Sequence, residues 1–119
     1  SVAAIHLNFL DDNRGRWIWN AALNPAAVNA LYAEADGPVM VSFDIDAVDQ
    51  SEAPGVSGPA VGGMSVSLWL HAAYQAGRSP KVTSVDLVEC NPVHDVDGRT
   101  ARLAAVTVWQ VLRGLAERE

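Results

Sequence analysis

The stretch VMVSFDID at residues 39–46 is a nearly continuous apolar run that ends in two acids. Such a run is typical of a strand covered on both faces in a parallel sheet, whereas a strand with one wet face alternates. Residues 81–88 (KVTSVDLV) are rich in β-branched side chains and predict a second strand. These two segments, with a helical pattern between them, indicate an α/β protein.

Helical patterns surround the two strands. Asn24-Pro25 predicts a helix start, because Asn caps the helix and Pro suits its first position, and Asp36-Gly37-Pro38 ends this helix. Ser65 predicts a second helix that runs to about Ala76 and is closed by Gly77.

The two ends of the chain carry further elements. Residues 2–10 (VAAIHLNFL) predict a short buried strand. Asp97 or Thr100 caps a last helix, whose apolar face is wide enough to be buried on more than one side. The order of elements predicts consecutive βα units of one open, mostly parallel sheet.

Composition excludes several classes of protein. Of 119 residues, 50% are hydrophobic and 18% charged, which is the balance of a globular domain and not of a disordered chain. The formal net charge of -6 argues against a nucleic-acid partner, which needs a basic surface. No apolar run is long enough for a membrane span. The single Cys90 excludes an internal disulfide and favours the cytoplasm.

Asp44 and Asp46 are the first candidates for chemistry. At positions i and i+2 after an apolar strand, period two places both carboxylates on one side. Two like charges beside a hydrophobic strand repel each other, and a cation such as Mg²⁺, Mn²⁺ or Ca²⁺ relieves this. The alternative from these residues alone is that both acids only cap the turn after the strand.

Three longer stretches carry a family resemblance: VSFDIDAVDQSEAPG at residues 41–55 with Gly63 beyond it, SVDLVECNP at 84–92, and DVDGRTARLAA at 95–105. Together they resemble the ureohydrolase superfamily of arginase, agmatinase and formimidoylglutamase. The resemblance implies a three-layer α/β fold, with a mostly parallel sheet and helices on both faces. Residues 1–119 would form a single partial domain, the carboxy-terminal part of that arginase-like fold.

The resemblance also implies a role for three acids. Asp44 and Asp46 would be metal ligands in a site that is binuclear, with two Mn²⁺, in the complete enzyme. Glu89 would act in catalysis by binding the cationic end of a small amidine or guanidine substrate through charge-assisted hydrogen bonds. Residues 53–60 (APGVSGPA) and 97–102 (DGRTAR) look most like formimidoylglutamases, which convert N-formimidoyl-glutamate to glutamate and formamide. Arginase or agmatinase activity, with release of urea, is the alternative.

The resemblance is incomplete at the amino-terminal side. The family's GGDHS-like and DAHxD-like segments are missing from residues 1–40, where His6 in AIHLNFL matches neither. We expect a truncated chain that is inactive in isolation, with a degenerate paralogue as the alternative. A non-catalytic interaction module or pseudoenzyme is the hypothesis from another class. The complete protein is expected to form a homo-oligomer, as family members commonly do.

Other polar residues are expected to be structural. Asp86 stands three residues before Glu89, so strand alternation points it to the opposite face, where a structural hydrogen bond is expected. Asp49 is expected to fix the loop that follows the first strand. His6, His71 and His94 are not expected to bind metal.

Overall fold

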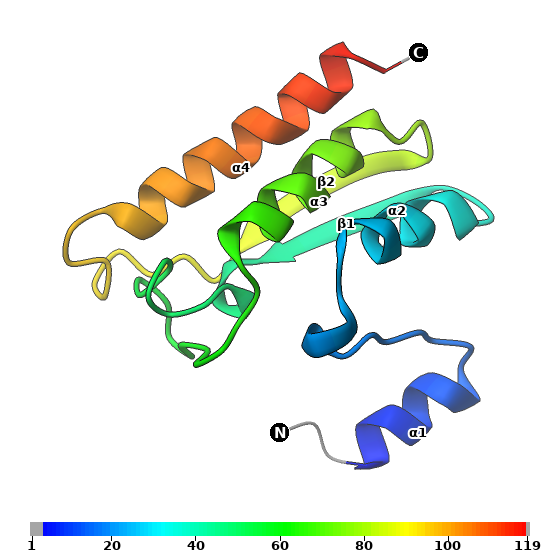
Figure 1. Cartoon of the computed structure of the whole chain (residues 1–119), viewed down its shortest axis with the longest axis horizontal. Helices are drawn as coiled ribbons and strands as arrows, with labels where there is room; N and C mark the ends of the chain where they lie inside the picture. Colours follow the sequence, from blue (N-terminus) through cyan, green and yellow to red (C-terminus); the bar gives the residue numbers. More distant parts are fainter. Residues whose placement is uncertain (1–3, 119) are drawn as a thin grey trace.

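The structure, a computed structural model, describes residues 4–118 (Figure 1). Four α-helices, two 3₁₀ turns and two strands follow one another in these residues. In chain order they are α1 (Ala4–Asp12), η1 (Asn20–Ala22), α2 (Pro25–Glu34), β1 (Val39–Asp44), η2 (Ile45–Ala47), α3 (Val66–Arg78), β2 (Val82–Val88) and α4 (Arg99–Ala116).

The two strands lie where the sequence predicts them and pair in parallel. Their register runs from Val39 opposite Val82 to Asp44 opposite Val88, with one irregularity after Val39. α3 makes the crossover between them, as parallel neighbours require. Both strands therefore end at the same edge of the sheet, and the α/β prediction is confirmed.

The core lies between the sheet and the helices that cover one of its faces. Phe43 of β1 is buried and meets Trp69 of α3 edge to face, with ring centroids 5.2 Å apart. Leu103 of α4 belongs to the same buried cluster. On the other face of β1, Met40 is 66% exposed. Within residues 4–118, α3 and α4 therefore cover the face that carries Phe43.

The helices α3 and α4 lie side by side (Figure 1) and approach closely at two glycines. A Cβ at Gly77 would overlap the carbonyl oxygen of Val111 and lie 2.8 Å from Leu115 N. A Cβ at Gly114 would in turn overlap the carbonyl oxygen of Tyr74. The prediction that Gly77 closes α3 is wrong, because the helix continues to Arg78 and Gly77 serves this contact instead.

The buried strand predicted for residues 2–10 is also wrong. Positions 4–12 form α1, which has no buried residue, and positions 2–3 lie outside the described residues. A helix satisfies its backbone N–H and C=O groups internally, whereas a strand needs a neighbour to do so. Asn13 Nδ2 donates to Phe9 O (2.8 Å) at the end of this helix.

Two predicted helix starts are confirmed and a third is not. Asn24 accepts a hydrogen bond from Ala27 N (3.0 Å), and Ser65 accepts one from Leu68 N (3.3 Å). α4, predicted to be capped by Asp97 or Thr100, has Gly98 at its N-cap with φ of 71°. Glycine adopts this left-handed conformation without steric cost, and acids from the preceding turn bond the free N–H groups of α4.

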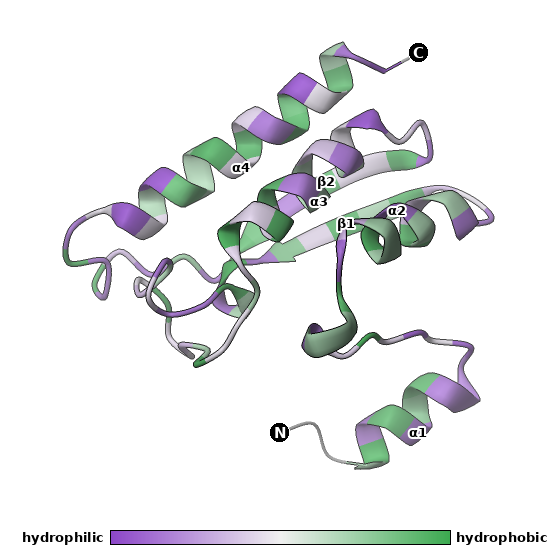
Figure 2. Cartoon of the chain, viewed as in Figure 1, coloured by the Kyte–Doolittle hydropathy of each residue, from purple (hydrophilic) through white to green (hydrophobic). Residues whose placement is uncertain are grey.

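Only part of the wide apolar face of α4 is buried. Leu103 and Thr107 are buried against α3 and the sheet. Figure 2 shows apolar residues along most of the helix, and several large ones are exposed: Val106, Val108, Trp109, Leu112 and Leu115. Burial on more than one side is thus not found within residues 4–118. No helix in this part of the chain combines the length and apolarity that a bilayer crossing requires.

Candidate functional site

Three acids meet at the edge where both strands end. Asp44 is the last residue of β1, Asp46 lies in η2, and Glu89 follows the last residue of β2. Burial raises the pKa of Asp46, and so do the nearby charges of Asp44 and Glu89 and a hydrogen bond with Asp44. The structure therefore places the three acids that the family resemblance implies at one edge of the sheet.

The way in which Asp44 and Asp46 meet differs from the prediction. Because β1 ends at Asp44, strand alternation does not orient Asp46. The chain instead turns tightly into η2, and Asp46 N donates to Asp44 Oδ1 (3.3 Å). Asp44 thus caps the turn, as the structural alternative held, and its side chain still lies beside that of Asp46.

Glu89 has an unusual backbone. Its φ is 67°, in the left-handed region that costs a non-glycine residue about 1–2 kcal/mol. Strand alternation consequently stops at Val88. The expectation that Glu89 and Asp86 point to opposite faces, which assumed a continuous strand, therefore no longer applies. Such strain is commonly found where surrounding contacts hold a functional side chain in place.

The donor set suits a divalent cation but is incomplete. Carboxylates with uncompensated charge, at the carboxyl end of parallel strands, provide oxygen ligands of the kind that Mn²⁺ and Mg²⁺ accept. Across residues 4–118, however, no three His, Cys, Asp or Glu side chains are grouped so that they could hold a metal ion. Asp44 and Asp46 can therefore form only part of a metal site.

The loop at residues 47–63 is well fixed, and Asp49 fixes it as expected. Asp49 accepts hydrogen bonds from Ser51 N (2.9 Å), Ser51 Oγ (2.6 Å) and Gly62 N (2.9 Å). Short bridges join Val48 to Met64 and Asp49 to Ala60. The loop also passes beside Asp46, because a Cβ at Gly58 would lie 3.4 Å from Asp46 Oδ2.

Asp49 should make the stability of this loop depend on pH. The hydrogen bonds from Ser51 hold the pKa of Asp49 below its ordinary value of 3.8. A lowered folded-state pKa contributes stability above pH 3.8 that is lost as the pH falls through the folded-state value. We expect Asp49→Asn to lower Tm at pH 7 and the gap to wild type to close below pH 3.8. A constant gap across this range in thermal unfolding would contradict the role of the charge.

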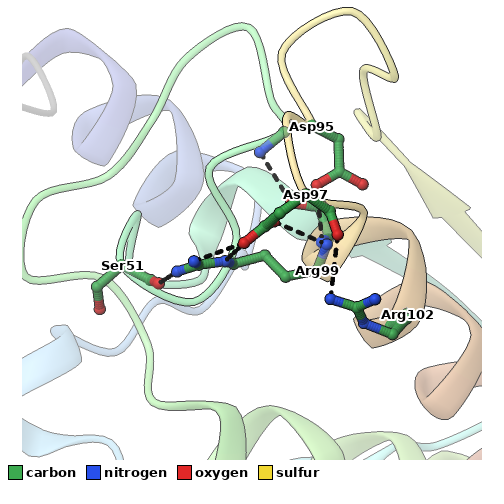
Figure 3. Close-up of polar contacts among 7 residues, drawn as sticks. Ser51, Asp95, Asp97, Arg99 and Arg102 are labelled. Atoms are coloured by element: carbon green, nitrogen blue, oxygen red, sulfur yellow. Dashed lines mark hydrogen bonds and ion pairs between the residues drawn. The ribbon is translucent and has the colours of Figure 1, made fainter.

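The first turn of α4 also fixes the 47–63 loop, through a contact between Arg99 and Ser51 (Figure 3). Arg99 Nη1 donates to Ser51 O (2.8 Å), and Arg99 Nη2 pairs with Asp97 Oδ2 (2.6 Å). The hydrogen bonds from Arg99 lower the pKa of Asp97. Asp97 also accepts a hydrogen bond from Arg99 N (3.1 Å), the first residue of α4. Among the described contacts, this is the only hydrogen bond by which Asp97 caps the helix.

The histidines and Asp86, which were not expected to take part in the site, lie outside this group of acids. His6 and His94 are exposed, and His71 Nε2 shares a hydrogen bond with Asn29 Oδ1 (2.9 Å) on the helical side of the molecule. Asp86 lies within β2, opposite Ser42, and its buried Oδ1 has no hydrogen-bond partner in the described residues. The structural hydrogen bond expected for Asp86 is thus not found at this atom.

Sequence reasoning missed a set of hydrogen bonds that join the 47–63 loop to the segment after β2 and to the first turn of α4. Asp95 accepts from Thr100 N (3.0 Å) and Ala101 N (2.9 Å), and Thr100 Oγ1 accepts from Gly55 N (2.8 Å). Asn91 N donates to Gly55 O (2.7 Å). An Asp shortly before a helix is a weak capping signal, and the contact across 45 positions from Gly55 to Thr100 leaves no local pattern.

Known proteins share this sequence pattern. A family model described as the arginase family matches residues 15–114. A formimidoylglutamase from Enterobacter sp. (strain 638) is 40% identical over 86 residues, which cover 72% of this chain and 27% of that protein. A mitochondrial agmatinase from Gallus gallus is 34% identical over 94 residues, which cover 79% of this chain and 27% of that protein.

The fold is shared as well. The crystal structure of Trypanosoma cruzi formiminoglutamase with Mn²⁺ superimposes with a TM-score of 0.92 and 28% identity, over 98% of this chain and 40% of that one. The match to the Enterobacter and Gallus gallus proteins spans about a quarter of the length of each. Its arginase-like α/β fold and the match over residues 15–114 lead to one conclusion: the chain belongs to the arginase family.

Proposed function

We propose that this chain is part of a manganese-dependent hydrolase that cleaves C–N bonds of linear amidines or guanidines. The observation that carries the proposal is the meeting of Asp44, Asp46 and Glu89 at the carboxyl ends of β1 and β2. Asp44 and Asp46 would bind the cations. When bound, a pair of divalent cations lowers the pKa of water and so supplies a nucleophile at neutral pH.

Glu89 would orient the substrate. Its carboxylate can accept two parallel hydrogen bonds from the N–H groups of an amidinium or guanidinium, and this fixes the plane of the carbon to be attacked. A fixed plane raises the rate, because the reacting atoms are already oriented in the bound state and less entropy is lost on reaching the transition state. The strained, left-handed backbone at Glu89 supports this role, because such strain is common at functional sites.

The substrate we favour is N-formimidoyl-glutamate. Water oxygen would bond to the formimidoyl carbon while the bond from that carbon to the glutamate nitrogen breaks and the nitrogen takes a proton. The products are formamide and glutamate. The similarity to the formimidoylglutamase from Enterobacter supports this choice of substrate. The similarity to the agmatinase of Gallus gallus supports urea release as the second candidate.

A substrate panel tests the proposal. The natural polypeptide at its full length would be loaded with Mn²⁺ and offered N-formimidoyl-glutamate, arginine and agmatine. We expect formamide release with a kcat/KM at least about tenfold above that for either guanidine. Preferential urea release would transfer the assignment to arginase or agmatinase, and no hydrolysis at all would favour a non-catalytic module.

The setting of the protein is part of the same proposal. A homo-oligomer is expected, and the exposed apolar side chains of α4 offer a surface for it. The cytoplasm is proposed as the compartment because the chain has a single cysteine.

A further inference from the structure

Gly55 connects two segments that are distant in the sequence. Its N–H donates to Thr100 Oγ1 (2.8 Å) in the first turn of α4, and its carbonyl accepts from Asn91 N (2.7 Å). Thr100 is 0% exposed. Asn91 stands two residues after Glu89, so Gly55 links the buried hydroxyl to the segment that carries the substrate-orienting acid.

The position of Thr100 is itself fixed. The two carboxylate oxygens of Asp95 accept from Thr100 N and Ala101 N, which anchors the first turn of α4. Asp95 also packs directly on Gly55, because a Cβ at Gly55 would lie 2.9 Å from both Cα and Cγ of Asp95. Neither the hydroxyl nor the glycine can shift without moving the other.

The same linkage reaches Asp46. Asn91 Nδ2 donates to Ser57 Oγ (3.0 Å), one residue before Gly58, which borders Asp46 Oδ2. Residues 55–58 therefore lie between the segment after Glu89 and the carboxylate of Asp46. A displacement of this short segment would change the position of one acid relative to the other.

We propose that Thr100 is a positioning residue whose buried hydroxyl, acting through Gly55 and Asn91, sets the place of Glu89 relative to Asp44 and Asp46. The chemical consequence rests on the proposed function, because the group that Glu89 orients is the amidine of that reaction. Without the hydroxyl, the N–H of Gly55 is buried with no acceptor, and the segment must move to find one.

The structure offers an isosteric test with a matched control. Thr100→Val replaces the hydroxyl with a methyl group of similar size, and Thr100→Ser keeps the hydroxyl. Thr107 is a second buried threonine, and its Oγ1 accepts from Trp69 Nε1 (2.7 Å) away from the three acids. Thr107→Val therefore also orphans one buried donor, and it controls for loss of stability alone.

The variants would be made in the full-length natural protein, with two readouts. Amide hydrogen exchange at Gly55 and Asn91 should be at least about tenfold faster in Thr100→Val than in Thr107→Val, which accounts for faster exchange caused by lower global stability. With N-formimidoyl-glutamate as substrate, kcat should fall about 10- to 100-fold in Thr100→Val with a smaller change in KM. Thr100→Ser should restore both values to within about threefold of wild type.

Each possible outcome decides the proposal. Exchange at Gly55 and Asn91 that is no faster in Thr100→Val than in Thr107→Val overturns it, as does a kcat no lower than that of Thr107→Val, or a failure of Thr100→Ser to restore kcat. If the wild-type protein hydrolyses no amidine, the proposed function fails, and the exchange result alone decides whether Thr100 holds this segment.

Discussion

Glu89→Gln is expected to lower kcat/KM for amidine hydrolysis about 100-fold, because the substrate loses charge-assisted hydrogen bonds at the carbon to be attacked. The substitution keeps the shape of the side chain, removes its charge and replaces one acceptor oxygen with an NH2 group, which donates. Steady-state kinetics of the Mn²⁺-loaded full-length protein give the result. Glu52→Gln, the same change at an exposed acid of the 47–63 loop, serves as the control and should stay within about twofold of wild type.

The backbone at Glu89 supplies a second comparison at the same position. Ala at a φ of 67° keeps the strain, whereas Gly relieves it. Glu89→Gly should therefore be more stable than Glu89→Ala by about 1 kcal/mol, while both variants are as inactive as Glu89→Gln. Wild-type activity in Glu89→Gln, or equal stability of the Gly and Ala variants, would contradict the role given to this residue.

Gly77→Ala is expected to lower the free energy of unfolding by about 2–3 kcal/mol. In an isolated helix the same change is stabilising by about 1 kcal/mol, so the sign of the effect is informative. The reason is the close approach of α4, whose Val111 carbonyl oxygen would be overlapped by the new Cβ. Chemical denaturation monitored by circular dichroism gives the value.

Gly37→Ala is the matched control for this change. A Cβ at Gly37 would have no atom within 4 Å, so its effect should stay within about 0.5 kcal/mol. A Gly77→Ala variant as stable as wild type would mean that α3 and α4 do not approach each other as closely as the structure has them.

The elements that sequence reasoning found are those with a strong local signal. β1 and β2 are short runs of apolar or β-branched residues bounded by Pro, Lys and acids, and Asn24 and Ser65 bond the free N–H groups of the helices they begin. Asp44 and Asp46 could be singled out from the pattern of two acids after an apolar strand, because ligands in α/β proteins bind outside the carboxyl ends of parallel strands. Glu89 is identified only through the resemblance of residues 84–92 to the ureohydrolases.

The elements that it missed depend on contacts across the chain. The apolar run at residues 4–12 suits a helix or a strand, and only the presence or absence of a neighbour decides between them. Gly77 looks like a helix stop until α4 is placed against it. Thr100, Asn91 and Gly55 meet only after β1, β2 and α4 are assembled, so no local pattern identifies them.

The most direct test of the central claim is the binding of Mn²⁺ to the full-length natural protein and to its Asp44→Ala/Asp46→Ala variant, measured by titration calorimetry with metal analysis. Loss of both ions in the variant, with the fold retained, is the predicted result, because in the proposed function these carboxylates supply oxygen ligands at the edge of the sheet where Glu89 lies. Equal stoichiometry and affinity in the two proteins would show that Asp44 and Asp46 do not bind the metal, and the assignment of this edge as the hydrolase site would be wrong.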